Sequence, residues 1–168
     1  MNAKNLAVIL VVLLALLFGC ALPGNDPALY EKLSALEQKY FVAQNYSSNL
    51  TPMNDYINEL IQLKSTANGS FGKVIESEIY SAQTFYYLQK ALVSSTAIDY
   101  QNISCSSTEV KDTRALIKIA KINSDKALKL LATLSDAEKV NLRPNQIDLV
   151  KGYTSQIDQI VKFFDEKC

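Results

Sequence analysis

The sequence predicts an all-α protein, an antiparallel bundle of about four to five helices behind an N-terminal signal or anchor segment. Apolar residues recur at spacings of three and four along five stretches of the chain, which is the period of an amphipathic helix. No run of alternating apolar and polar residues lies between hairpin turns, so we expect no sheet. The stretches are separated by short polar loops, which favour antiparallel packing of neighbouring helices.

The first three helices follow from local signals. Asp26-Pro27 and Thr51-Pro52 each place a capping side chain before a proline, which is typical of a helix start. The two helices that begin there are expected to end near Gln44 and Ala67. A polar and glycine-containing loop is expected over 68–72. The third helix then runs from Lys73 to about Tyr100, with a length of roughly 40 Å.

Two capping boxes predict the next elements. Ser106 with Glu109 predicts a fourth helix that ends near Leu134, and Ser135–Glu138 predicts a short extra turn. Arg143-Pro144 opens the last helix, since proline is favoured at the first helical position. Its apolar stripe continues nearly to the C-terminal residue.

Composition excludes several classes of function. The chain has no histidine, which excludes Ser-His-Asp and Cys-His catalysis and His-ligated zinc or haem. Its 17 basic and 17 acidic residues balance, so we expect no nucleic-acid partner. Glu76 and Glu78 come nearest to a carboxylate pair, but residues two apart on a helix do not face each other. We therefore predict no catalytic residue, no metal and no cofactor; an enzyme would need two or more carboxylates, or a lysine, buried together in a cleft.

The N-terminus has the composition of a secretory signal peptide. Lys4 precedes thirteen consecutive apolar residues, Leu6 to Phe18, and small residues follow. A charged start, an apolar stretch of this length and small residues define such a leader. Two fates of this segment compete with cleavage before Cys20. Cleavage after Ala21 would give a secreted protein, and retention of the 17 residues from Leu6 to Leu22 would give a short single-pass membrane anchor.

Leu17-Phe18-Gly19-Cys20 resembles the lipobox of prokaryotic lipoproteins, although Phe18 is larger than the residue usual at its position. The resemblance implies a signal peptide over 1–19 and a lipid on Cys20. It also implies a location on the outer face of a prokaryotic cell membrane. Residues 20–26 would then be the lipidated cysteine and a short tether, and 27–168 a single helical-bundle domain.

The three cysteines support this division. They are Cys20, Cys105 and Cys168, and an odd number in an exported protein leaves one thiol to explain. With antiparallel helices, Cys105 and Cys168 both fall at the end of the bundle far from the membrane. We expect them to form a disulfide, which an exported compartment permits. Cys20 is then the remaining cysteine, at the position where a lipid would be attached.

Four Asn-x-Ser/Thr sequons stand at predicted loops or helix ends: Asn45, Asn49, Asn68 and Asn102. In an archaeal or eukaryotic exported protein these asparagines would be N-glycosylation sites. In most bacteria they would be turn residues only.

These observations predict a non-enzymatic, membrane-anchored protein that binds or scaffolds at the cell envelope. Its partner would be an envelope protein or a glycan, and the apolar stripes also allow a homodimer. An alternative is a small-ligand or glycan binding protein. Its pocket would lie between helices and be lined by Tyr80, Tyr86, Tyr87 and Tyr100, although tyrosines of this kind are more often packed in a core.

Overall fold

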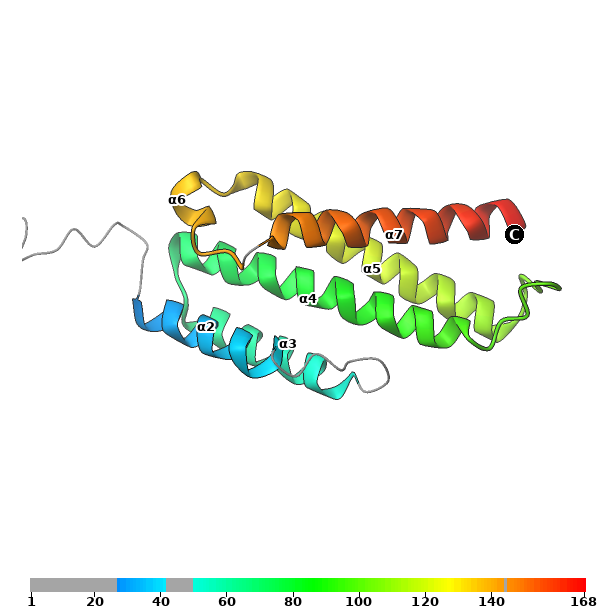
Figure 1. Ribbon diagram of the computed structural model, residues 1–168, viewed down its shortest axis with the longest axis horizontal. Coiled ribbons are helices and arrows are strands. Elements are labelled where there is room, and N and C mark those ends of the chain that lie inside the picture. The colour runs from blue at the N-terminus through cyan, green and yellow to red at the C-terminus, as the bar shows by residue number, and fades with distance from the viewer. Residues whose placement is uncertain (1–26, 42–49, 144) are drawn as a thin grey trace, which may run out of the picture.

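The structure, a computed structural model (Figure 1), describes residues 27–41, 50–143 and 145–168. Every regular element in these ranges is a helix, and the ranges contain no strand. The prediction of an all-helical chain is confirmed. The helices are α2 (Pro27–Phe41), α3 (Thr51–Thr66), α4 (Gly69–Ser95), α5 (Thr108–Thr133), α6 (Asp136–Lys139) and α7 (Gln146–Lys167).

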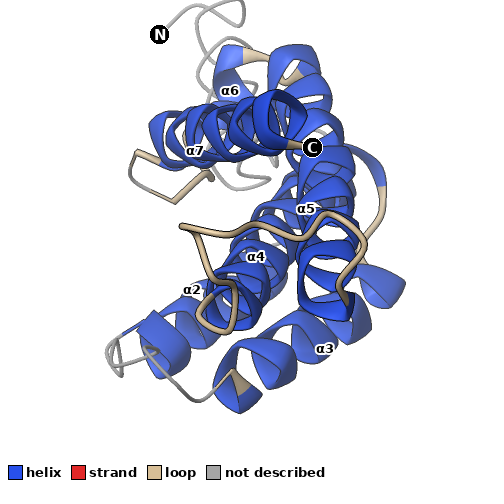
Figure 2. Cartoon of the chain, turned by 90° about the vertical axis from the view of Figure 1, so that its right-hand side faces the viewer, coloured by secondary structure: helices blue, strands red, loops and turns tan. Residues whose placement is uncertain are grey.

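Successive long helices run in alternating directions along the long axis of the molecule (Figure 1). α4 is the central element, because it packs against α3, α5, α6 and α7. Seen end on, it lies between α7 on one side and the α2–α3 pair on the other (Figure 2). α2 contacts α3.

The start of α4 differs from the prediction. The expected loop over 68–72 is already helical from Gly69 onward. Phe71, Val74 and Ile75 are buried, and the burial of these side chains outweighs the turn propensity of the neighbouring glycines and serine. Gly69 itself has a φ of +63°, a conformation that glycine adopts without steric cost.

The end of α4 also differs, because the helix stops at Ser95 rather than near Tyr100. The Ser95 hydroxyl donates to the Leu92 carbonyl at 2.7 Å, and the Thr96 hydroxyl donates to the Val93 carbonyl at 2.7 Å. Such local side-chain bonds compete with helical backbone bonds. The chain then turns and buries Ile98.

The caps of the later helices are confirmed in part. The N-cap of α5 is Ser107, whose hydroxyl accepts from the Val110 amide, so the predicted cap at Ser106 is wrong by one residue. The capping box of Ser135 and Glu138 is present at α6. α7 begins at Gln146, with Asn145 in the left-handed region as its N-cap. The predicted start at Arg143-Pro144 is therefore too early, and Pro144 itself lies outside the described residues.

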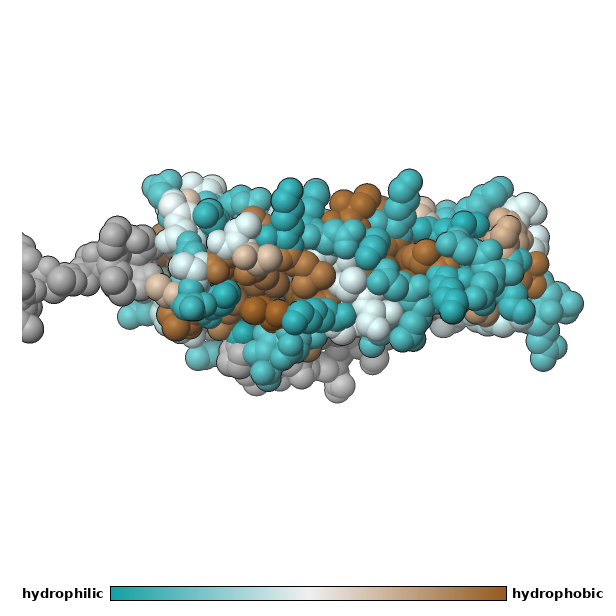
Figure 3. Space-filling model, turned by 90° about the horizontal axis from the view of Figure 1, so that it is seen from above, coloured by the Kyte–Doolittle hydropathy of each residue, from teal (hydrophilic) through white to brown (hydrophobic). Residues whose placement is uncertain are grey.

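The core divides along the long axis. A large cluster joins α2, α3 and α4 to the end of α5 and the start of α7. Two smaller clusters follow between α4, α5, α7 and the loop after α4. α3 is 16 residues long and α4 is 27, and the large cluster joins the α2–α3 pair mainly to the N-terminal part of α4. Viewed from above, apolar side chains gather at the end of the molecule that holds α6 (Figure 3).

The predicted disulfide is confirmed. The sulfurs of Cys105 and Cys168 lie 2.07 Å apart, at bonding distance, and the Cα atoms are 5.5 Å apart. The bridge joins the loop between α4 and α5 to the C-terminus of α7. None of the helices in the described ranges is long and apolar enough to span a membrane.

Candidate functional site

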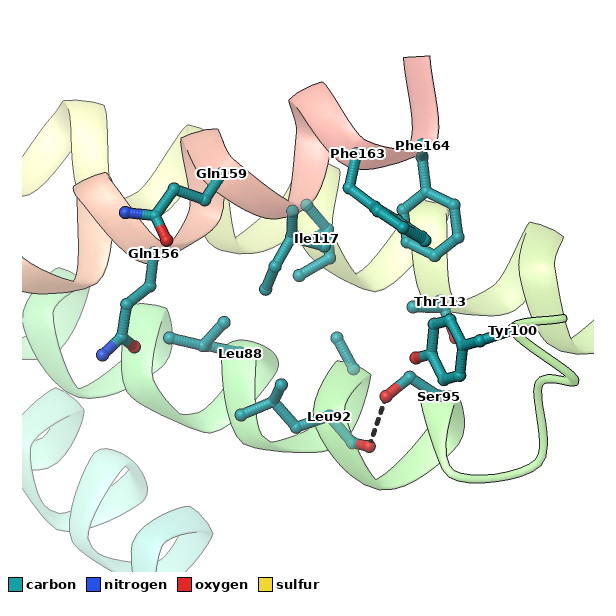
Figure 4. A pocket seen from close by; sticks show the side chains of 12 residues that line it. Leu88, Leu92, Ser95, Tyr100, Thr113, Ile117, Gln156, Gln159, Phe163 and Phe164 are labelled. Atoms are coloured by element: carbon teal, nitrogen blue, oxygen red, sulfur yellow. Dashed lines mark hydrogen bonds between the residues drawn. The ribbon is translucent and has the colours of Figure 1, made fainter. Parts of the chain in front are cut away.

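A pocket of about 470 Å³ lies between α4, α5 and α7, in the half of the molecule nearer the C-terminus (Figure 4). This volume falls within the range of about 300–1,000 Å³ that is typical of small-molecule sites. We call it the distal pocket. Its lining residues are Leu88, Ala91, Leu92, Ser95, Tyr100, Thr113, Ile117, Gln156, Gln159, Ile160, Phe163 and Phe164.

The floor of the distal pocket is apolar and rigidly packed. Leu88, Ala91, Ile117 and Phe164 are all no more than 3 % exposed, and the first three belong to one packed cluster. The rim is open to solvent, since Leu92 is 41 % exposed. A ligand in the pocket would therefore contact preformed apolar walls on one side and water on the other.

One buried polar atom of a lining residue has no hydrogen-bond partner among the residues that the structure describes. It is the Thr113 hydroxyl, which is buried in a residue that is only 1 % exposed. A buried hydroxyl without a partner costs about 1–3 kcal/mol in proteins. By contrast, the Ser95 hydroxyl is already bonded to a carbonyl of its own helix (Figure 4).

The end of the pocket near the disulfide is formed by two aromatic side chains from different segments. Tyr100 reaches in from the loop after α4 and lies beside Phe163 of α7, with ring centroids 5.9 Å apart (Figure 4). The Cys105–Cys168 bridge joins that loop to the end of α7. The disulfide therefore holds these two walls of the pocket together.

The four tyrosines of the predicted pocket do not line one common cavity. Tyr80 lines a hollow between α3 and α4, Tyr86 lines another between α4 and α5, and Tyr100 lines the distal pocket. Tyr87 packs edge-on against Tyr86, with centroids 5.2 Å apart. The distal pocket takes only Tyr100 from the predicted set.

A second polar feature lies in the other half of the molecule, where Glu78 of α4 is 1 % exposed. One carboxylate oxygen accepts from the Tyr56 hydroxyl at 3.0 Å and lies 3.1 Å from Arg143 Nη2. The other oxygen makes no hydrogen bond to a described residue. Nearby, the Gln146 amide donates to the Ser81 hydroxyl at 3.3 Å.

Burial dominates the electrostatics around Glu78. It raises the pKa of Glu78, although Arg143 and the Tyr56 hydrogen bond act in the opposite direction. Glu37 of α2 is half-buried, and its pKa is raised to about 7, first by burial and then by the negative charge of Glu78. Burial likewise raises the pKa of Tyr56. Glu78, Glu37 and Tyr56 therefore lie in surroundings that disfavour their ionised forms.

The sequence alone did not predict this cluster. Glu76 and Glu78 do point apart as expected, since Glu76 pairs with Lys64 near the surface. The available signal was the spacing of Glu78 itself, which falls within the apolar stripe of Val74, Ile75 and Ile79. A carboxylate inside such a stripe requires a buried positive partner or a shifted pKa.

The other predicted site residues are placed in part. Asn68 and Asn102 are both exposed, and their glycosylation stays a prediction. Cys20, Asn45 and Asn49 lie outside the described residues, as does the predicted leader.

Comparison with known proteins gives no relative: no protein-family model, curated protein or solved structure matches this chain. Within the described ranges, no group of three or more histidine, cysteine, aspartate or glutamate side chains is placed to hold a metal ion.

Proposed function

We propose that this protein is a membrane-anchored, extracytoplasmic binding protein, whose site is the distal pocket and whose ligand is a small apolar molecule. Residues 27–168 would act as one bundle of five long helices, with the pocket between α4, α5 and α7. The observation that carries the proposal is the distal pocket itself, which combines an apolar floor with an opening to solvent.

The chemistry of the distal pocket and of the Glu78 cluster favours binding over catalysis. Among the described residues, the lining of the distal pocket contains no aspartate, glutamate, lysine or arginine, and so lacks the usual groups for proton transfer. Glu78 has a perturbed pKa but is closed off from solvent, where it would not contact a substrate. Its partners, Tyr56 and Arg143, come from α3 and the segment before α7, which suits a structural role.

The location of the pocket fits an anchor at the N-terminus. α2 begins at the end of the molecule opposite the C-terminus (Figure 1), and the pocket lies in the half nearer the C-terminus. With a lipid on Cys20, the tether from Ala21 to Asp26 would reach about 20 Å at most. The pocket would then face away from the bilayer and receive its ligand from the envelope.

Binding is tested with naphthalene, a neutral apolar ring system, by equilibrium dialysis against the full chain. We expect saturable binding with about one site per chain, because the ligand displaces water from an apolar surface that is already formed. Replacement of Ala91 in the floor by leucine fills the pocket and should weaken this binding at least tenfold. The matched control is Ala115→Leu, at an exposed position of α5. Equal affinity of both variants, or no saturable binding by the parent, would contradict the proposal.

The anchor is tested by the intact mass of the protein purified from the membranes of its native host. The expected mass corresponds to residues 20–168 plus a lipid. If the chain retains residues 1–19, its anchor is a membrane helix and not a lipid on Cys20. A chain that begins at Leu22 without lipid would make the protein a secreted one.

A further inference from the structure

We infer that the outer face of α5 docks on a surface of anionic lipid headgroups through a row of exposed lysines. We call this face the basic row, and its members are Lys111, Ala115, Lys118, Ile122, Lys126 and Lys129. The inference goes beyond the proposed function, because the basic row is not part of the distal pocket. It takes from the proposed function only the anchor, which would keep a bilayer within reach.

The basic row follows from the periodicity of α5. Its six members are spaced three or four residues apart, so they share one side of the helix, and all six are exposed. The buried residues of α5, among them Ile117, Ala120 and Ala127, lie on the opposite side, against α4 and α7. At 1.5 Å per residue, the row is roughly 27 Å long from Lys111 to Lys129.

The positive charge of the basic row is not compensated by described residues. Its four lysines form no ion pair there, and the row holds no aspartate or glutamate. The neighbouring cations of α5 are already paired. Arg114 lies 3.4 Å from Asp165 of α7, and Lys121 lies 3.2 Å from Asp125 and 3.1 Å from Asp158. The charge that remains for a partner therefore belongs to the row.

Two neighbours modify this picture only slightly. Asp112, next to Lys111 in the sequence, lines a hollow toward α4 together with Lys90. The Lys126 ammonium lies over the Tyr80 ring, 5.1 Å from its centroid, a contact that keeps its charge.

The apolar residues of this face favour a lipid surface over an acidic protein. Ile122 is 46 % exposed, and Ile119 beside the row is 38 % exposed. Such side chains enter the boundary between headgroups and acyl chains, while lysines reach the headgroups on flexible stems. Next to Ala115 and Lys118, a hollow of about 420 Å³ opens between α5 and α7, with apolar side chains of both helices in its lining.

The direction of the row agrees with the proposed anchor and the pocket. α5 ends near α6, at the end of the molecule where α2 begins (Figure 1), so a tether of about 20 Å would let the bundle lie along the bilayer. α5 contributes only buried residues, Thr113 and Ile117, to the distal pocket. The exposed rim belongs to α4 and α7, and it would stay open to solvent when the row is docked.

The test uses tryptophan as a reporter, since the chain has none. Ile122→Trp places it in the basic row, and Leu92→Trp places it on the exposed rim of the distal pocket. Each full chain is mixed with vesicles of phosphatidylcholine or of phosphatidylglycerol, both with brominated acyl chains that quench a tryptophan in contact with them. We expect phosphatidylglycerol alone to quench Ile122→Trp and shift its emission to shorter wavelength. Leu92→Trp should respond to neither lipid.

Charge variants separate the row from the net charge. In Ile122→Trp, replacement of all four lysines of the row by glutamine should abolish the quenching, because each lysine near an anionic surface strengthens binding about fivefold. The matched control makes the same change in net charge at four exposed lysines elsewhere and should keep the quenching; these are Lys32, Lys73, Lys151 and Lys162. About 0.5 M NaCl should abolish the quenching with the row intact, a result that does not depend on the folding of a variant.

Three results would overturn the inference: no quenching of Ile122→Trp by phosphatidylglycerol, equal quenching by both lipids, or equal loss in the two sets of lysine variants. An emission change of Ile122→Trp with soluble polyglutamate, but not with phosphatidylglycerol, would assign the row to an acidic protein instead. Naphthalene binding is independent of all these outcomes, so the proposed function and this inference fail separately.

Discussion

Removal of the disulfide is expected to lower the free energy of unfolding by about 4 kcal/mol. Cys105 and Cys168 are 63 residues apart, and in the chain-entropy model a loop of this length restricts the unfolded chain by that amount. The variant is the double substitution Cys105→Ser, Cys168→Ser, and the measurement is urea unfolding followed by circular dichroism. Few single features of a domain this size contribute as much.

Reductant provides the matched control for this experiment. Added to the parent chain, it should lower the urea midpoint to that of the double variant. Added to the double variant, which retains only Cys20, it should change nothing. A difference below about 1 kcal/mol between the parent and the double variant would contradict a stabilising bridge between the loop after α4 and the C-terminus.

Replacement of Arg143 by methionine is expected to cause the second large loss in the free energy of unfolding. It removes the positive partner of Glu78, whose carboxylate is buried. Breaking a buried ion pair on one side costs about 3–5 kcal/mol, because the remaining charge has no compensation. We expect a loss of about 3 kcal/mol at pH 8, measured by urea unfolding.

Arg114→Met is the matched control, since it removes an arginine from an exposed pair. Arg114 lies 3.4 Å from Asp165, and both side chains are substantially exposed, so the expected loss is below about 1 kcal/mol. The double variant Arg143→Met, Glu78→Gln should recover most of the stability, because the glutamine side chain is uncharged and still accepts from the Tyr56 hydroxyl. Equal losses of stability in Arg143→Met and Arg114→Met would contradict the role of Arg143 as the stabilising partner of buried Glu78.

The same measurements between pH 5 and pH 8 test the raised pKa values. Glu37 has an ordinary value of 4.5 and a value of about 7 in the folded chain. Between these limits the folded chain holds more protons than the unfolded chain, so this group lowers stability as the pH rises and has no further effect above about pH 7. The raised pKa of Glu78 acts in the same direction. Arg143→Met should therefore be less destabilising at pH 5 than at pH 8, because the raised pKa of Glu78 favours its neutral carboxyl form at the lower pH.

The helices were predictable because their signals are local. The Ser135–Glu138 capping box marks a helix start that the structure confirms. Thr51-Pro52 lies at the start of α3 as expected, although the N-cap there is Leu50 and not Thr51. The disulfide was predictable because alternating helix directions bring Cys105 and Cys168 to one end. The boundaries of α4 were not, since the burial of Phe71 at its start and of Ile98 after its end depends on tertiary packing.

The Glu78 cluster and the distal pocket depend on contacts between distant segments, which local sequence patterns do not report. Arg143 has the sequence context of a helix start, yet its side chain pairs with Glu78, 65 positions earlier. The distal pocket lies between α4, α5 and α7, and the relative placement of these helices is decided by tertiary packing. The four tyrosines of the predicted pocket do not meet in one cavity, because Tyr80 and Tyr86 line different hollows beside α4 and Tyr100 lies in the loop after it.

The most direct test of the proposed function is a methyl NMR titration of the full chain with naphthalene. Ring currents from the bound ligand should shift the methyl signals of Leu88, Ile117 and Ile160, which line the distal pocket. The methyl signals of Leu33 and Leu60, buried in the core formed by α2, α3 and α4, should not move. Shifts confined to Leu33 and Leu60, or no shifts at saturating naphthalene, would contradict a ligand site between α4, α5 and α7.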